Sequence, residues 1–87
     1  MYVIMVYDVN QRRINKVLNT ARKYLEWIQN SVLEGEITEA KFEMLKREIE
    51  IIINEEEDSV IFYIMRTTKY SERQILGIEK NKREQIL

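Results

Sequence analysis

The sequence predicts a single α+β domain in which two helices pack on one β-sheet. Three observations lead to this fold class. Residues 2–7 and 59–65 are apolar on both alternating sets of positions, as in strands that are covered on both faces. Two other segments repeat apolar residues at helical spacing. The 87 residues leave room for one domain, spanning 1–87, with a thin core.

The first strand is expected over Tyr2 to Tyr7, and it ends at Asp8. Because both of its faces are apolar, it should lie in the middle of the sheet. Asn10 can cap the helix that follows. The apolar stripe of this helix consists of Ile14, Val17, Leu18, Ala21 and Leu25.

The remaining elements follow from the same patterns. Leu25 to Ile37 alternates as two short strands, interrupted by a turn or bulge at Gln29, Asn30 and Ser31. Thr38 can cap a second helix that ends near Asn54. Its stripe consists of Phe42, Leu45, Ile49, Ile52 and Ile53. A last strong strand is expected over residues 59–65, and residues 74–78 form a short fifth candidate.

The resulting order, β-α-β-β-α-β, is the ferredoxin-like pattern, in which both helices lie on one face of the sheet. One apolar sheet face therefore stays uncovered, which predicts a homodimer with facing sheets. Residues 59–65 should form an edge strand. The fifth strand and charged tail, residues 72–87, are expected to cover this edge, from the same chain or by packing on the partner subunit.

Composition restricts the chemistry. The chain has neither cysteine nor histidine, so that catalysis would have to use carboxylates, hydroxyls or cations. No apolar run approaches a membrane span, which predicts a soluble cytoplasmic protein without a membrane partner. Residues 1–33 and 59–87 each carry a net charge of +3, whereas residues 34–58 carry −7. Any nucleic-acid site should therefore lie away from the second helix.

The strongest candidate for a chemical site is Asp8. It is expected at a sheet rim close to helix N–H groups and to Arg12 and Arg13, which suit a phosphate. A carboxylate beside a phosphate site suits Mg²⁺. The alternative is that Asp8 only caps the helix or forms an Asx turn. A dimer would supply two copies of Asp8, which can share one ion if they face each other.

A basic helix face offers a second candidate. Arg12, Lys16 and Lys23 fall on neighbouring turns and can follow a nucleic-acid backbone, although an ordinary solvated face has the same pattern. Ser31 and its polar neighbours can donate hydrogen bonds to phosphates, or can simply form a hairpin turn.

Taken together, the motifs "YVIMVYDV", "WIQNSVLEGEI", "DSVIFYI" and "LGIEK" resemble the Cas-two family of small CRISPR adaptation proteins. The resemblance implies a homodimer that joins the Cas-one integrase in antiviral defence. It also implies metal-dependent endonuclease activity on single-stranded RNA, double-stranded DNA or both. Asp8 would be the metal-binding aspartate, paired across the two-fold axis, with Tyr7, Arg12, Arg13 and Ser31 in the active region. Leu33 departs from the family, which often has Phe there.

Three functions remain open at this point. The first is a Mg²⁺-dependent phosphodiesterase in which water attacks phosphorus and the Asp8 pair holds the metal. The second is a non-catalytic scaffold that bridges the Cas-one integrase and holds spacer DNA. The third is a small-molecule regulatory domain of the same fold, although the chain has no glycine-rich ligand loop.

Overall fold

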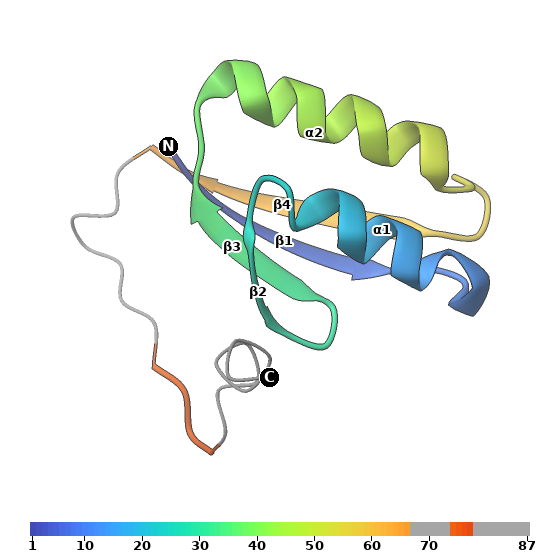
Figure 1. Ribbon diagram of the computed structural model, residues 1–87, viewed down its shortest axis with the longest axis horizontal. Coiled ribbons are helices and arrows are strands. Elements are labelled where there is room, and N and C mark those ends of the chain that lie inside the picture. Colours follow the sequence, from blue (N-terminus) through green and yellow to red (C-terminus); the bar gives the residue numbers. More distant parts are fainter. Residues whose placement is uncertain (67–73, 78–87) are drawn as a thin grey trace.

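Two helices cover one face of a four-stranded antiparallel sheet (Figure 1). The structure is a computed structural model that describes residues 1–66 and 74–77. Its elements are β1 (Tyr2–Asp8), the short 3-10 helix η1 (Gln11–Arg13), α1 (Ile14–Ala21), β2 (Glu26–Gln29), β3 (Val32–Glu36), α2 (Glu39–Ile52) and β4 (Ser59–Met65). This order confirms the predicted ferredoxin-like α+β fold.

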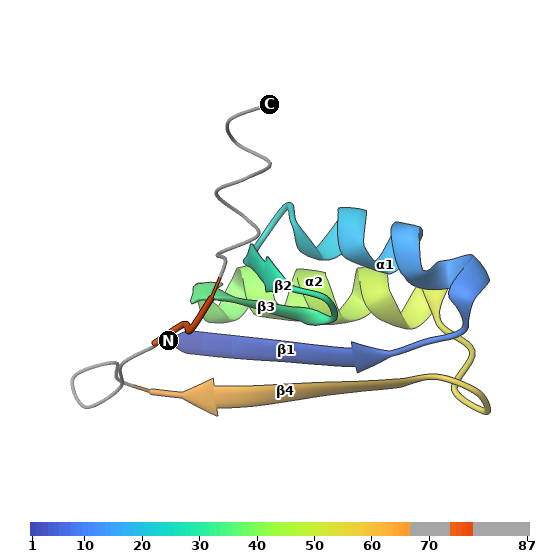
Figure 2. The same ribbon diagram turned by 90° about the horizontal axis from the view of Figure 1, so that it is seen from below.

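The strand order is β2-β3-β1-β4, which places β1 in the middle and β4 at an edge, as predicted. The side chains of β1 alternate between the two faces. Val3, Met5 and Tyr7 point toward the helices and are buried. Both helices lie on this side of the sheet (Figure 2).

Side-chain caps mark the helix starts that the sequence predicts. The Asn10 side chain accepts a hydrogen bond from the backbone of Arg12, and the Thr38 hydroxyl accepts one from the backbone of Lys41. The first helix is shorter than expected, because α1 ends at Ala21 and Leu25 reaches the core from the connection that follows.

The polar trio between β2 and β3 forms both of the predicted features. A bulge interrupts the β2–β3 register between Trp27 and Gln29. At Asn30, φ is 39°, a left-handed conformation that asparagine tolerates well. The chain can thereby reverse tightly between two short strands.

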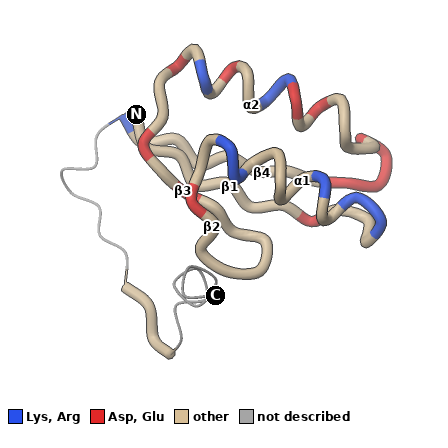
Figure 3. The backbone as a smooth tube through the Cα atoms, viewed as in Figure 1, with Lys and Arg blue, Asp and Glu red and all other residues tan. Residues whose placement is uncertain are grey.

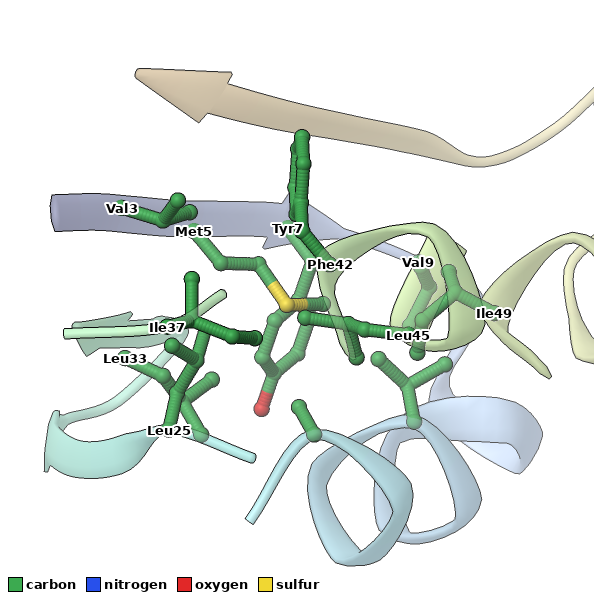
Figure 4. Packing of buried hydrophobic residues seen from close by; sticks show 12 residues of the cluster. Val3, Met5, Tyr7, Val9, Leu25, Leu33, Ile37, Phe42, Leu45 and Ile49 are labelled. Carbon is green, nitrogen blue, oxygen red and sulfur yellow. The ribbon is translucent and has the colours of Figure 1, made fainter. Parts of the chain in front are cut away.

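The core fills the layer between the sheet and the helices (Figure 4). Phe42 of α2 meets Phe62 of β4 edge to face, with ring centroids 5.1 Å apart. The buried apolar cluster consists of Val3, Met5, Tyr7, Val9, Val17, Ala21, Leu25, Leu33, Ile37, Phe42, Leu45 and Ile49. These side chains come from both helices, from β1 and β3, and from the connections that contain Val9, Leu25 and Ile37.

The opposite side of the sheet, called the open face below, is covered by neither helix (Figure 2). Its apolar side chains come from the three strands β1, β3 and β4 and are half-buried or exposed in the single chain. They are Tyr2, Ile4, Val6, Val32, Ile61, Tyr63 and Met65. Glu34 lies among them and accepts a hydrogen bond from the Tyr2 hydroxyl.

The fifth strand predicted at 74–78 does not form within this single chain as far as it is described. Residues 74–77 adopt no strand, and residue 78 lies outside the described residues, as does the charged tail. Packing of residues 72–87 on a partner subunit stays a prediction. In the part of the chain that the structure describes, no helix is long and apolar enough to span a membrane.

Candidate active site

Several predicted site residues meet at one end of the sheet, called the rim below. The rim comprises Asp8 at the end of β1, helix η1, the β2–β3 turn and the start of β4 (Figure 1). Asp8 pairs across the sheet with Ser59. The neighbouring Tyr7 N–H donates to the Ser31 carbonyl at 3.1 Å, which joins the turn to β1. Asp8, Arg12 and Ser31 therefore belong to one region of the molecule.

The Asp8 side chain is exposed, and it makes no hydrogen bond or ion pair with the residues that the structure describes. Asn10 provides the cap at the start of η1. The alternative role considered for Asp8, a helix cap or an Asx turn, is therefore not the role that it has here. Its carboxylate is left available to bind a ligand.

A single copy of the chain brings one carboxylate, Asp8, to the metal site that the sequence predicts. Among residues 1–66 and 74–77, no three Asp, Glu, His or Cys side chains gather into a cluster that could hold a metal ion. Mg²⁺ commonly binds one or two protein carboxylates and keeps several waters. An exposed Asp8 fits one such ligand, and a second chain would bring another.

The two arginines of η1 have different surroundings. Arg13 Nε lies 2.6 Å from Asp58 Oδ2, and its Nη2 lies 2.7 Å from Glu57 Oε2. Only 16% of the Arg13 side chain is exposed, compared with 72% for Arg12. Arg12 reaches Glu57 only at 3.9 Å. The guanidinium of Arg12 is thus available to a phosphate, whereas that of Arg13 is occupied by carboxylates.

These ion pairs shift the titration of both partners. Hydrogen bonds from Arg13 hold the pKa of Asp58 well below its usual range, and bonds from the backbone of Asn54 and Asn10 act in the same direction. The same contacts raise the pKa of Arg13. This cluster is therefore fully charged at neutral pH.

The basic face predicted for the first helix is interrupted. Lys23 forms an ion pair with Glu48 of α2, and Glu48 also accepts a hydrogen bond from the Tyr24 hydroxyl. These bonds lower the pKa of Glu48 and raise the pKa of Lys23. Lys16 is exposed and makes no ion pair with the described residues. Free positive charge therefore gathers toward η1 (Figure 3).

Tyr7 lies in the core, and its expected place in the active region stays a prediction. It follows the strand alternation and points to the helix side, away from the face of Asp8. Figure 4 shows its ring among the core side chains. Burial raises the pKa of its hydroxyl, which lies 3.4 Å from the Asn30 carbonyl. Its position suits packing rather than contact with a substrate bound at Asp8.

Sequence patterns missed two residues of the rim. Ser59 lies opposite Asp8, a placement that requires the β1–β4 register. Asp58 ends the acidic run 55–58, a pattern typical of solvated residues, yet its side chain is 0% exposed. The available signal was its place directly before a strong strand.

Comparison with known proteins gives consistent matches. A family model described as CRISPR associated protein Cas2 matches residues 1–73. A Thermotoga maritima protein named CRISPR-associated endoribonuclease Cas2 is 58% identical over 80 residues, covering 92% of each chain. A Pyrococcus furiosus protein of the same name is 49% identical over the full length of both chains.

Solved structures agree with these matches. One described as a crystal structure of cas2 superposes with a TM-score of 0.82 at 42% identity, covering 92% of this chain and 90% of the other. Streptococcus pyogenes Cas2, crystallised at pH 6.5, gives a TM-score of 0.78 at 32% identity, covering 88% and 100%. Both support the fold.

Proposed function

Because this chain belongs to the Cas2 family of CRISPR-associated proteins, we propose that it is an adaptation protein whose homodimer hydrolyses phosphodiester bonds of RNA with the help of Mg²⁺. Relatives that are up to 58% identical carry the name endoribonuclease. The observation that carries the proposal is the exposed Asp8 carboxylate at the rim, which makes no hydrogen bond or ion pair with the described residues; the exposed guanidinium of Arg12 belongs to η1 at the same end of the sheet. Double-stranded DNA is the second substrate to be tested.

The dimer is supported by the open face. This surface presents Ile61 and Tyr63, which are about half exposed, on an otherwise half-buried apolar sheet. Contiguous apolar surfaces of this kind usually mark interfaces. A two-fold axis between the facing sheets would give the dimer two copies of Asp8. If the two carboxylates share one ion, the metal site is complete only in the dimer.

The side chains of the rim would divide the chemistry. The two Asp8 carboxylates would hold Mg²⁺, which when bound neutralises phosphate charge and activates water. Arg12 and Lys16 would bind the flanking phosphates. Ser31 lies in the turn beside β1, where its side chain hydrogen-bonds the Tyr7 hydroxyl, so it would have to turn away from Tyr7 to donate to a phosphate oxygen. Water is the nucleophile, so no covalent intermediate with the protein forms.

The test compares cleavage of single-stranded RNA and double-stranded DNA by the wild type, by Asp8→Asn and by Glu50→Gln. Glu50 is an exposed carboxylate on α2, on the helix side of the sheet and thus away from the face of Asp8, and serves as the matched control. We expect Mg²⁺-dependent cleavage by the wild type and by Glu50→Gln only. Equal rates for the wild type and Asp8→Asn would eliminate this mechanism.

A second candidate function is a scaffold that binds spacer DNA and bridges the Cas-one integrase. It is favoured by one observation, the exposed cations Arg12 and Lys16, which can hold DNA without any contribution from Asp8. Spacer acquisition in cells separates the two functions. Acquisition that survives Asp8→Asn but is lost in an Arg12→Ala, Lys16→Ala double variant would favour the scaffold.

A further inference from the structure

The carboxylate of Asp58 is held by four hydrogen bonds. It accepts two from the backbone, from Asn10 N–H and Asn54 N–H, each at 2.8 Å. It accepts two more from Arg13, from Nε at 2.6 Å and from Nη2 at 3.1 Å. An ionised carboxylate can accept about four hydrogen bonds, one for each lone pair, and Asp58 accepts four. Its oxygens therefore have no lone pair left to bind a ligand.

We propose that Asp58 and Arg13 form a clamp that positions Asp8, with Asp58 as the positioning residue. The inference rests on the proposed function of Asp8 and assigns the orientation of that carboxylate to a buried ion pair that touches neither metal nor substrate. It also gives the two adjacent arginines different roles: Arg13 stabilises the fold of the rim, whereas Arg12 contacts phosphate.

The clamp fastens both chain segments that flank Asp8. On one side, Asp58 binds the backbone of Asn10, which lies only two residues beyond Asp8. On the other side, it directly precedes Ser59, the strand partner of Asp8. One carboxylate thereby joins the end of β1 to the start of β4. A shift of either segment would move Asp8 relative to its copy on the partner subunit.

Burial distinguishes this pair from ordinary surface ion pairs. The side chain of Asp58 is 0% exposed, whereas that of Glu57 is 43% exposed. Glu57 contacts the same arginine, but unlike Asp58 it accepts no hydrogen bond from the backbone N–H of Asn10 or Asn54. The loss of one acceptor from a buried network leaves donors unsatisfied, whereas an exposed pair is readily replaced by water. Glu57 is therefore a matched control for Asp58.

The experiment uses the full chain as Asp58→Asn, with Glu57→Gln as the control and Arg13→Lys as a second variant. Arg13→Lys keeps Asp58 and a positive charge but loses the paired donors, and so tests the clamp if Asp58→Asn does not fold. Amide hydrogen exchange of Asn10 and Asn54 is measured by NMR. Mn²⁺, as a paramagnetic probe, reports metal bound at Asp8, and RNA cleavage is separated into kcat and KM.

We expect amide exchange at Asn10 to accelerate about tenfold or more in Asp58→Asn and in Arg13→Lys, and to stay close to wild type in Glu57→Gln. The kcat should fall about tenfold while KM stays near the wild-type value, because substrate contacts are retained. Broadening by Mn²⁺ at Asp8 should weaken in the same two variants.

Two results would overturn the clamp. One is unchanged exchange at Asn10 in folded Asp58→Asn, whatever happens to cleavage. The other is faster exchange with unchanged kcat and Mn²⁺ broadening, which would show that the ion pair stabilises the rim without positioning Asp8. If the wild type itself neither binds Mn²⁺ at Asp8 nor cleaves RNA, the proposed function fails and the positioning of a catalytic Asp8 fails with it. Faster exchange at Asn10 would then still show that Asp58 fastens the rim.

Discussion

Replacement of Ile61 by aspartate should separate the proposed homodimer. Ile61 lies on the open face opposite Val6 and is 46% exposed in the single chain. Full burial of such a side chain contributes about 1.5–3 kcal/mol, so covering the exposed half contributes about 1 kcal/mol per copy. A two-fold interface loses this amount twice, about 2 kcal/mol, which corresponds to a roughly thirtyfold weaker dimer.

The new carboxylate adds to this loss. A charge that is buried without a partner costs considerably more than the missing methyl groups, and the two-fold axis brings two such charges into one interface. We therefore expect Ile61→Asp to be monomeric at concentrations where the wild type is a dimer. Because each monomer has one Asp8, its Mg²⁺-dependent cleavage should also be lost.

Sedimentation velocity over a wide range of protein concentration measures the dimer dissociation constant directly. Ile51→Asp is the matched control, since Ile51 is 85% exposed on α2, a helix on the other side of the sheet. Its dissociation constant should equal that of the wild type. A wild-type protein that stays monomeric, or an Ile61→Asp variant that dimerises normally, would refute the reasoning from the open face.

Four further predictions concern the rim. Asp8→Asn should abolish Mg²⁺-dependent cleavage and change the free energy of unfolding by less than about 0.5 kcal/mol, since the side chain is exposed and has no partner among residues 1–66 and 74–77; urea titration checks this. Arg12→Ala should raise KM with an unchanged urea midpoint, whereas Arg13→Ala should lower the midpoint; the reverse pattern would contradict the assignment. Tyr7→Phe should lower the free energy of unfolding by at most about 1 kcal/mol and leave kcat unchanged, because the hydroxyl lies on the helix side of the sheet. Loss of cleavage in this variant would show that the hydroxyl takes part in the active site. The contribution of ionised Asp58 to the free energy of unfolding should be fully present above its unfolded pKa of about 3.9, and it should be lost as the pH falls through its lower folded pKa. Asp58→Asn should therefore lose less stability than the wild type as the pH falls through this range, which thermal unfolding at a series of pH values measures.

Most of the fold could be predicted because its signals are local. Apolar periodicity gives the strands and helices, and Asn10 and Thr38 cap the helices as their side chains allow. The miss at the end of α1 has a physical reason. Leu25 keeps the helical spacing and is buried, but a buried position can be reached from a loop as well as from a helix.

The site was harder to predict because it depends on contacts between distant residues. Asp8 could be selected by its place after a buried strand. The adjacent arginines, however, cannot be told apart without the neighbours that Arg13 finds 45 positions away. Tyr7 shows the opposite difficulty. It is the direct neighbour of Asp8 in the sequence, and successive side chains of a strand point to opposite faces, so the two residues lie on different sides of the sheet.

The pairing of charges also changes where nucleic acid should approach. Arg12, Lys16 and Lys23 form one basic stripe in the sequence, but Glu48 pairs with the last of them, at the end of α1 farthest from the rim. α2 lies beside that end, and its four Glu side chains outnumber its Lys and Arg side chains by only one. The exposed charges of Arg12 and Lys16 lie in η1 and the first turn of α1, at the same end of the sheet as Asp8. A nucleic-acid backbone should therefore cross the rim rather than run along the whole of α1, which brings a phosphate to the carboxylate proposed to act on it.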